Sequence, residues 1–317
     1  MARTAQFKQE TAGDGRFVRQ GNRFTDRITA DGSGGFAAEP GRYQLYVSLA
    51  CPWAQRSLIV RRLLGLTEAI AVTVVDPIRD GRGWRFTLSP DDRDPATGAG
   101  FLADLYRATD PGFEGRATVP AIWDTESKRL VTNDYPQITL DLETEWTAYH
   151  GPDAPDLYPV ELRDEIDAIS AVIFRDVNNG VYKAGFATSQ SAYEGAFDAL
   201  FATMDDLEGR LARQRFLVGD RLTEADVRLY TTLARFDAVY YSHFKCNLRR
   251  LVVYPNLWGY TRDLYSRPAF RETTDFDHIK RHYYGTHDQI NPSRIVPKGP
   301  AIDWDAPHER DRFEPTL

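Results

Sequence analysis

The sequence of 317 residues predicts a small α/β domain followed by an all-helical domain. Two observations indicate this order. Short β-rich runs alternate with helical segments as far as about residue 150, and apolar residues at helical spacing dominate from Leu157 onward. The turn-forming stretch His150-Gly151-Pro152 is the expected boundary between the two domains.

The first domain is organised around Cys51, which follows a β-rich run over residues 43–49. Pro52 comes next and suits the first position of a helix, because its missing N–H would be unpaired there and its φ angle is preset. Apolar residues continue on one helical face as far as Leu64, and Gly65 supplies a stop. A thiol at a helix N-terminus has a lowered pKa, which favours a nucleophilic thiolate. The alternative is a buried structural cysteine, which is common.

The other expected elements of this domain complete a β-α-β, insertion, β-β-α order. They are a strand at 69–75, a polar insertion at 76–117 with a short helix near 101–106, a hairpin of strands at 119–124 and 130–132, and a helix from about residue 135. Asn133 and Asp134 are expected to cap that helix, which opens on Tyr135 and Pro136. This order is typical of a thioredoxin-type domain.

The second domain shows the apolar spacing of helices. Apolar side chains recur on one helical face from Leu162 to Ile173 and from Tyr193 to Leu211. Thr223 and Asp226 form a capping box for a third helix, and a fourth is expected over 257–264. The resulting prediction is an irregular arm at 1–40 with docking residues Phe17, Phe24 and Phe36, a thioredoxin-like domain at 41–149, a helical domain at 150–285 and a surface tail at 286–317.

Charge and cysteine content exclude several function classes. A formal charge of −7 argues against nucleic-acid binding, and no run approaches the roughly 18 apolar residues of a membrane span. Residues 1–10 are polar, unlike a signal peptide. Cys51 and Cys246 fall in different expected domains, so they form no disulfide framework and favour a reducing, cytoplasmic compartment, with Cys246 a packing residue. The absence of zinc-type ligand spacing predicts no metal site.

Five motifs occur in order: Cys51-Pro52-Trp53-Ala54, Gly83-Trp84-Arg85-Phe86, Asn179-Gly180-Val181-Tyr182-Lys183, His243-Phe244-Lys245-Cys246-Asn247-Leu248-Arg249-Arg250 and Asp277-His278-Ile279-Lys280-Arg281-His282-Tyr283-Tyr284. Together they resemble the glutathionyl-hydroquinone reductases, which are the Xi class of glutathione transferases. The resemblance extends from about residue 40 to residue 292. It implies the glutathione-transferase fold and a homodimer that pairs through its helical domains.

The resemblance also implies a reaction. In that family a cysteine attacks the sulfur of a glutathionylated hydroquinone, the free hydroquinone leaves, and a second glutathione resolves the mixed disulfide. Cys51 matches this cysteine, and Ala54 occupies the place of a CxxC partner, so the resolving thiol is external. Pro120, preceded by Val119, matches the proline that is cis in thioredoxin-like folds, where the preceding backbone pairs with the thiol co-substrate. Trp84 matches a residue that lines the thiol site.

Three tyrosines match residues that the family places around the aromatic substrate, namely Tyr182, Tyr240 and Tyr283. Their hydroxyls can hydrogen-bond the oxygens of the departing hydroquinone, and their rings offer stacking surface. Counting alone leaves Tyr284 as an alternative to Tyr283. A packing role is the alternative for each, and also for Trp84. The histidines His243, His278 and His282 are interpreted first as packed or solvated side chains.

The sequence departs from the family where glutathione-using members carry Glu-Ser at the start of the helix after the hairpin. Here Asp134 and Tyr135 stand in that place. Asp134 can still pair with an ammonium group, but Tyr135 is expected to crowd or reshape the pocket. The hypothesis that follows is a co-substrate other than glutathione, such as mycothiol.

Three alternatives to the reductase function remain at this point. One is a broader deglutathionylase or dehydroascorbate-type reductase that uses the same cysteine. Another is a noncatalytic binding module, because a fold alone never establishes activity. A cysteine hydrolase is the weakest, since no histidine is positioned to pair with Cys51.

Overall fold

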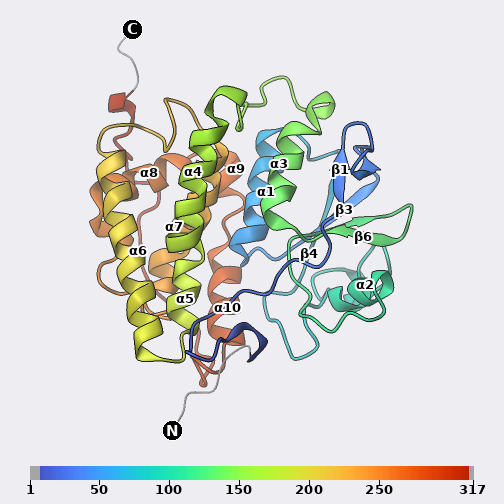
Figure 1. Ribbon diagram of the computed structural model, residues 1–317, viewed down its shortest axis with the longest axis horizontal. Coiled ribbons are helices and arrows are strands. Elements are labelled where there is room, and N and C mark those ends of the chain that lie inside the picture. Colours follow the sequence, from blue (N-terminus) through green and yellow to red (C-terminus); the bar gives the residue numbers. More distant parts are fainter. Residues whose placement is uncertain (1–7, 314–317) are drawn as a thin grey trace. The chain divides into compact units, whose positions relative to one another are not determined.

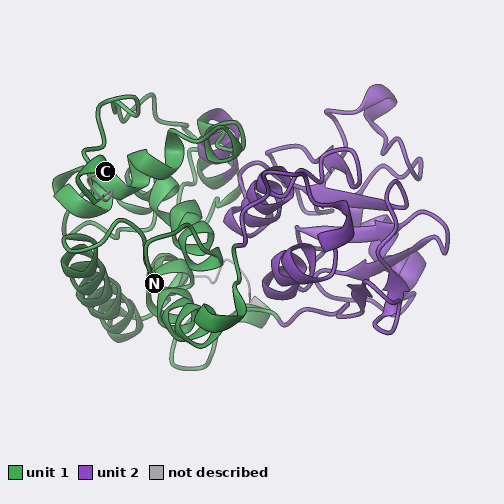
Figure 2. Ribbon diagram, turned by 90° about the horizontal axis from the view of Figure 1, so that it is seen from above, with its two compact units in different colours: residues 1–20, 157–276, 283–317 green, residues 21–156, 277–282 purple. Residues whose placement is uncertain are grey.

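The computed structural model describes residues 8–313 and divides them into two compact units. The sheet unit contains residues 21–156 and 277–282 (Figure 2). The helical unit contains residues 8–20, 157–276 and 283–313 of the described chain. Within residues 8–313 no helix has the length and apolar content that a membrane span needs.

The sheet unit has a four-stranded mixed sheet, a separate two-stranded sheet and the helices α1 to α3 (Figure 1). Its elements are β1 (Arg27–Thr29), β2 (Gly35–Ala37), β3 (Tyr43–Val47), α1 (Pro52–Leu63), β4 (Ala71–Val74), α2 (Leu102–Thr109), β5 (Ala121–Asp124), β6 (Arg129–Thr132) and α3 (Tyr135–Thr144). The strand order is β4-β3-β5-β6, with β3 parallel to β4 and antiparallel to β5. Every residue of β3 and β5 is buried, as expected for central strands covered on both faces. The four strands predicted from residue 43 onward are confirmed, and their ends lie within two residues of the predicted ones.

The expected irregular arm at 1–40 is not all irregular. Its described part is divided, with residues 8–20 in the helical unit and residues 21–40 in the sheet unit. β1 and β2 pair in parallel, and Gly34 permits their close approach, because a Cβ there would lie 2.8 Å from the Thr29 side chain. Three-residue strands are too short to show a period, so the glycine-rich sequence by itself predicts an irregular segment. Phe17 and Phe36 are buried.

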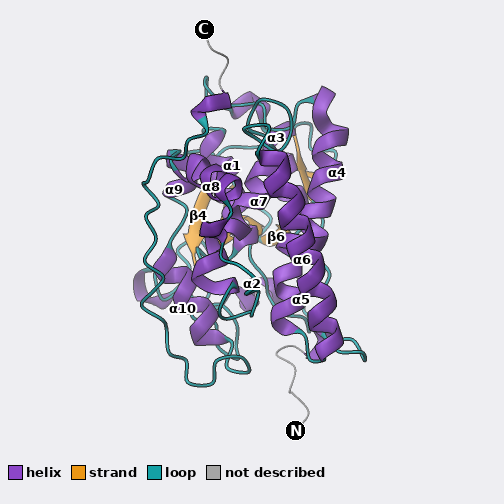
Figure 3. Cartoon of the chain, turned by 90° about the vertical axis from the view of Figure 1, so that its left-hand side faces the viewer, coloured by secondary structure: helices purple, strands orange, loops and turns teal. Residues whose placement is uncertain are grey.

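The helical unit consists of α4 (Arg163–Ile173), α5 (Gly180–Phe186), α6 (Gln190–Leu211), α7 (Glu224–Arg235), α8 (Pro255–Tyr265), α9 (Pro268–Arg271) and part of α10 (Phe276–Thr286). Two π-helical turns, η5 (Phe174–Asn178) and η6 (Phe236–Tyr240), interrupt the regular helical hydrogen bonding after α4 and α7. The remaining short turns are η1 (Lys8–Glu10), η2 (Pro90–Asp92), η3 (Thr147–Tyr149), η4 (Val160–Leu162), η7 (Leu251–Val253) and η8 (Asp311–Phe313). Figure 3 shows α5 and α6 side by side.

The predicted capping box of α7 is present and fully buried. The Asp226 carboxylate accepts hydrogen bonds from the backbone N–H and the hydroxyl of Thr223, at 2.8 and 3.0 Å. It also accepts from the Leu217 N–H and the Tyr260 hydroxyl. One carboxylate therefore ties the start of α7 to the preceding loop and to α8.

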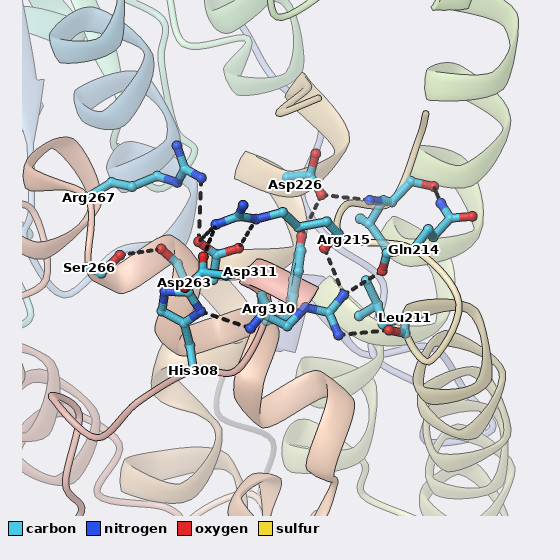
Figure 4. Close-up of polar contacts among 12 residues, drawn as sticks. Leu211, Gln214, Arg215, Asp226, Asp263, Ser266, Arg267, His308, Arg310 and Asp311 are labelled. Carbon is cyan, nitrogen blue, oxygen red and sulfur yellow. Dashed lines mark hydrogen bonds and ion pairs between the residues drawn. The ribbon is translucent and has the colours of Figure 1, made fainter. Parts of the chain in front are cut away.

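The described part of the C-terminal segment packs on the helical unit. Trp304 contacts the rings of Trp258 and Phe276, each at a centroid distance of 5.0 Å. The buried Arg310 guanidinium donates to the main-chain carbonyls of Leu211, Gln214 and Arg215 at 2.5–2.9 Å (Figure 4). Gly259 of α8 leaves room for this segment, because a Cβ there would lie 2.7 Å from the His308 carbonyl oxygen.

Candidate active site

Cys51 occupies the N-cap position of α1, four residues after β3 ends. Its N–H donates to the Ser48 carbonyl at 2.9 Å, and its own carbonyl accepts from the Gln55 N–H at 3.0 Å, which closes the first turn. Pro52 stands at the first helical position, as the sequence predicts. The half-buried Sγ atom therefore lies at the end of the helix where N–H groups and the dipole favour an anion.

The second structural feature next to Cys51 is the Val119–Pro120 peptide bond, which is cis. The Cys51 thiol donates to the Val119 carbonyl oxygen, with the sulfur and oxygen 3.4 Å apart. The pairing of β3 with β5 explains this proximity, because Tyr46 and Ala121 are cross-strand partners and the two chains run on from there to Cys51 and Val119. The structure thus brings together Cys51, Val119 and Pro120, three residues that the sequence predicts for the site.

Trp84 is buried in the sheet unit and lies flat against a histidine of α10. The Trp84 and His282 rings stack at 5.0 Å and 25°, and His282 Nδ1 lies 2.8 Å from the Pro77 carbonyl oxygen. Trp84 Nε1 is buried and has no hydrogen-bond partner within the described residues. A buried N–H without a partner suits a ligand that brings an acceptor, such as a peptide carbonyl or carboxylate. His282, which the sequence suggested was packed or solvated, therefore positions Trp84.

Asp134 and Tyr135 open α3, as predicted. Asp134 is its N-cap and accepts from the Asn22 side-chain amide at 2.8 Å. The Tyr135 ring packs on Trp53, with centroids 4.6 Å apart, and the Arg56 guanidinium lies 4.5 Å from the Trp53 centroid. Trp53 follows Cys51 by two residues, so Tyr135 contacts the helical turn that carries the cysteine. The sequence alone places Trp53 in the motif around Cys51 but does not predict this contact.

In the helical unit the three predicted tyrosines form a hydroxyl cluster, with one member each from α5, η6 and α10. The Tyr283 hydroxyl lies 2.5 Å from that of Tyr182 and 2.9 Å from that of Tyr240. Burial raises the pKa of Tyr240 and of Tyr283 well above the ordinary value of 10. These two hydroxyls therefore stay protonated at neutral pH and can act as hydrogen-bond donors.

The hydroxyl groups of Tyr283 and Tyr284 have different partners. The Tyr284 hydroxyl lies 2.5 Å from Ser242 Oγ and donates to the Ala238 carbonyl at 3.2 Å. It therefore takes no part in the cluster that Tyr283 joins to Tyr182.

Two buried histidines, His243 and His287, pack against the Tyr283 ring of the cluster. His243 Nε2 and His287 Nδ1 are 3.1 Å apart, and the His243 ring packs against Phe244 and Tyr284. Burial lowers the pKa of His243 to about 4, so the ring is neutral near pH 7. Cys246 is fully buried and burial raises its pKa, which makes its thiol a poor nucleophile.

The predicted residues divide between the two units. The sheet unit holds those assigned to the thiol chemistry: Cys51, Trp84, Val119, Pro120, Asp134 and Tyr135. The helical unit holds Tyr182, Tyr240 and Tyr283. Within residues 8–313 no three His, Cys, Asp or Glu side chains gather so as to hold a metal ion.

A thioredoxin-type sheet with a cysteine at its first helix, followed in the chain by a helical unit, is the architecture of the glutathione transferases. The family model for the glutathione S-transferase N-terminal domain matches residues 50–145, and that for the C-terminal domain matches residues 190–263.

Curated relatives narrow the class. The glutathionyl-hydroquinone reductase YqjG of Escherichia coli is 47% identical over 309 residues, covering 94% of this chain and 93% of that protein. The glutathionyl-hydroquinone reductase PcpF of Sphingobium chlorophenolicum is also 47% identical, covering 94% of each chain.

Solved structures agree. A glutathione transferase from Gordonia bronchialis is 53% identical with a TM-score of 0.90, covering 92% of this chain and 91% of that one. The Xi glutathione transferase of Phanerochaete chrysosporium is 46% identical with a TM-score of 0.87, covering 92% and 99%. YqjG in its glutathione-bound form is 47% identical with a TM-score of 0.87, covering 91% and 96%. The chain belongs to the glutathionyl-hydroquinone reductases, the Xi class of glutathione transferases, and is an enzyme of that family.

Proposed function

We propose that this enzyme cleaves thioether conjugates of hydroquinones through a mixed disulfide on Cys51. The observation that carries the proposal is the position of Cys51. It is the N-cap residue of α1, and its thiol is hydrogen-bonded to the Val119 carbonyl. Ala54 occupies the place where a CxxC motif would have its second cysteine. Such a thiol can accept one thiol group from a substrate but needs an external thiol to release it. The names of the curated relatives, glutathionyl-hydroquinone reductases, support the same reaction.

The proposed first step is attack of the Cys51 thiolate on the sulfur of the conjugate in its keto tautomer. A sulfur–sulfur bond forms as the carbon–sulfur bond breaks, and the electron pair of the broken bond moves through the ring to the keto oxygen. The aromatic product then leaves as a hydroquinone monoanion. Hydroxyl donors stabilise such an oxyanion, and this is the role proposed for Tyr182, Tyr240 and Tyr283. A proton from solvent then completes the hydroquinone.

In the proposed second step a free thiol, as its thiolate, attacks the sulfur that came from the conjugate. A low-molecular-weight disulfide leaves and the Cys51 thiolate is regenerated. The net reaction is conjugate plus thiol to hydroquinone plus disulfide, so the thiol supplies the electrons. Trp84 Nε1 and the backbone at Val119 are proposed to hold the peptide-like part of the thiol, because the indole N–H has no partner among described residues.

Glutathione is the co-substrate that the relatives support, since the structures of YqjG and of yeast ECM4 were determined with it. The Tyr135 ring on Trp53 motivates a second candidate, mycothiol, whose sugar head group offers a different surface to an aromatic ring. The rate at which each thiol discharges the Cys51 mixed disulfide separates them. Equal rates would contradict any preference for mycothiol.

The functional test is turnover of glutathionyl-menadiol in the presence of glutathione, with menadiol release followed by chromatography. The expected result is release by the wild type and by Cys246→Ala, and none above background by Cys51→Ser. Cys246→Ala is the matched control because the Cys246 thiol is buried. Release that survives Cys51→Ser would refute the mixed-disulfide mechanism, whereas substrate binding without any turnover would favour a noncatalytic module.

We also propose that the enzyme is a homodimer paired through its helical units, as the family resemblance implies. Light scattering after size-exclusion chromatography tests this proposal. A mass near 36 kDa, that of one chain, would contradict it.

A further inference from the structure

The segment before the sheet unit is fixed to the helical unit at the junction of α5 and α6. The Thr188 N–H donates to the Gly15 carbonyl at 3.0 Å, and the Ser189 hydroxyl donates to the Asp14 carbonyl at 2.7 Å. Gly15 has a φ angle of +88°, and a Cβ there would lie 2.8 Å from Ser189 atoms, so only glycine fits. Two residues on, Phe17 is buried against Phe186, with ring centroids 5.4 Å apart.

This anchoring determines where Arg19 lies. Its Nε–H donates to the Asn179 side-chain oxygen at 3.0 Å, and Asn179 is the buried N-cap of α5. The guanidinium carbon stands 4.7 Å from the centroid of the Tyr182 ring and 5.4 Å from that of Phe17. The hydrogen bond to Asn179 and the two ring faces thus help to hold a permanent positive charge over Tyr182, which belongs to the hydroxyl cluster.

A cation over the face of a phenol ring draws electron density from the ring and makes the hydroxyl a better donor. The Tyr182 hydroxyl is joined to that of Tyr283, which is joined to that of Tyr240, so the effect reaches the whole cluster. An anionic oxygen bound by these hydroxyls would therefore also be stabilised by the charge of Arg19.

We infer that Arg19 is a positioning residue that acts through Tyr182 and makes the hydroxyl cluster selective for phenolate-like oxygens, including the monoanion of the departing hydroquinone. The inference rests on the proposed function for its catalytic consequence. It goes beyond that function by giving the N-terminal segment a part in recognition of the aromatic leaving group.

The test uses three variants of the full chain. Arg19→Gln keeps a hydrogen-bond donor and removes the charge, whereas Arg19→Lys keeps the charge. Arg16→Gln is the matched control, because Arg16 lies on the same segment but is paired with Asp14 and largely exposed. Thermal unfolding of each variant shows whether the fold is intact.

The first readout is equilibrium binding of 4-nitrophenolate, followed by its absorbance. We expect the dissociation constant to rise about tenfold in Arg19→Gln, a loss of about 1.4 kcal/mol of charge stabilisation of the bound phenolate, and to stay within about threefold in Arg19→Lys. Arg16→Gln should match the wild type. This readout requires no turnover, so it judges Arg19 even if the proposed reaction fails.

The second readout is the single-turnover rate of hydroquinone release from conjugates whose hydroquinones differ in acidity. In Arg19→Gln the rate should depend more steeply on leaving-group acidity, which a loss of packing alone would not cause. Binding of 4-nitrophenolate by a folded Arg19→Gln within twofold of the wild type would overturn the inference, and so would an Arg19→Lys variant as weak as Arg19→Gln. Absence of release by the wild type would refute the proposed function instead.

Discussion

Replacement of Arg310 by methionine measures how strongly the C-terminal segment stabilises the helical unit. The Arg310 guanidinium donates to three main-chain carbonyls, those of Leu211, Gln214 and Arg215, and is about 1% exposed. Hydrogen bonds from a charged donor contribute about 1.5–3 kcal/mol each, or about 6 kcal/mol for three. Burial lowers the pKa of Arg310 to about 10, which corresponds to a cost of about 3 kcal/mol for burying the charge.

The difference between the hydrogen-bond contribution and the cost of burying the charge predicts that Arg310→Met lowers the free energy of unfolding by about 3 kcal/mol. The assay is urea unfolding followed by tryptophan fluorescence at a fixed protein concentration, because the proposed dimerisation would make the midpoint depend on concentration. Arg312→Met is the control, since Arg312 makes one exposed bond to Asn256 and should change stability by less than about 0.5 kcal/mol. If Arg310→Met and Arg312→Met unfold at the same urea concentration, the reasoning about buried carbonyl partners is refuted.

Three further predictions follow from the site. Tyr283→Phe removes the hydroxyl that bridges Tyr182 and Tyr240, so the single-turnover rate of hydroquinone release should fall about 100-fold. The control Tyr284→Phe should stay within about threefold of the wild type. Equal effects of the two substitutions would contradict the role proposed for Tyr283. Burial lowers the pKa of His243 to about 4, so the folded state excludes a proton that the unfolded chain binds below about pH 6.5. The free energy of unfolding should therefore fall by about 2 kcal/mol between pH 7.5 and pH 5. Urea unfolding of His243→Gln should show a smaller loss over the same pH range. His282→Ala removes the ring stacked on Trp84, so the KM for the thiol should rise about tenfold, and an unchanged KM would show that Trp84 needs no such support.

The parts of the fold that could be predicted are those whose local chemistry allows one outcome. Pro52 after a β-rich run indicated the start of α1, and the Thr223–Asp226 capping box indicated the start of α7. Both signals lie within four residues of the element they start, so they are visible without tertiary contacts.

The helices that the sequence does not predict lack such a local signal. α5 has seven residues and follows a π-helical turn, which breaks the 3.6-residue spacing that identifies helices. α10 interleaves charged residues with its buried Ile279 and Tyr283, and its residues are divided between the two units. Ile279 and Tyr283 are spaced as on one helical face, but two apolar positions among charged residues are too few to identify a helix from the sequence.

The same distinction applies to the candidate site. The residue types and motifs indicated Cys51, Trp84 and the three tyrosines, but contacts between distant segments decided their surroundings. Only the folded chain shows that Tyr283, and not Tyr284, shares a hydrogen bond with Tyr182. The support of Trp84 by His282 joins residues almost 200 positions apart, and no local pattern reports such a contact.

The most direct test of the central claim is the mass of the intact protein after rapid mixing with glutathionyl-menadiol in the absence of free thiol. The proposed mechanism predicts a mass gain of one glutathione, located on Cys51 and absent in Cys51→Ser, together with one equivalent of free menadiol. Menadiol release without any protein adduct would contradict a mixed disulfide. No adduct and no release, from either a glutathione or a mycothiol conjugate, would contradict the proposed activity itself.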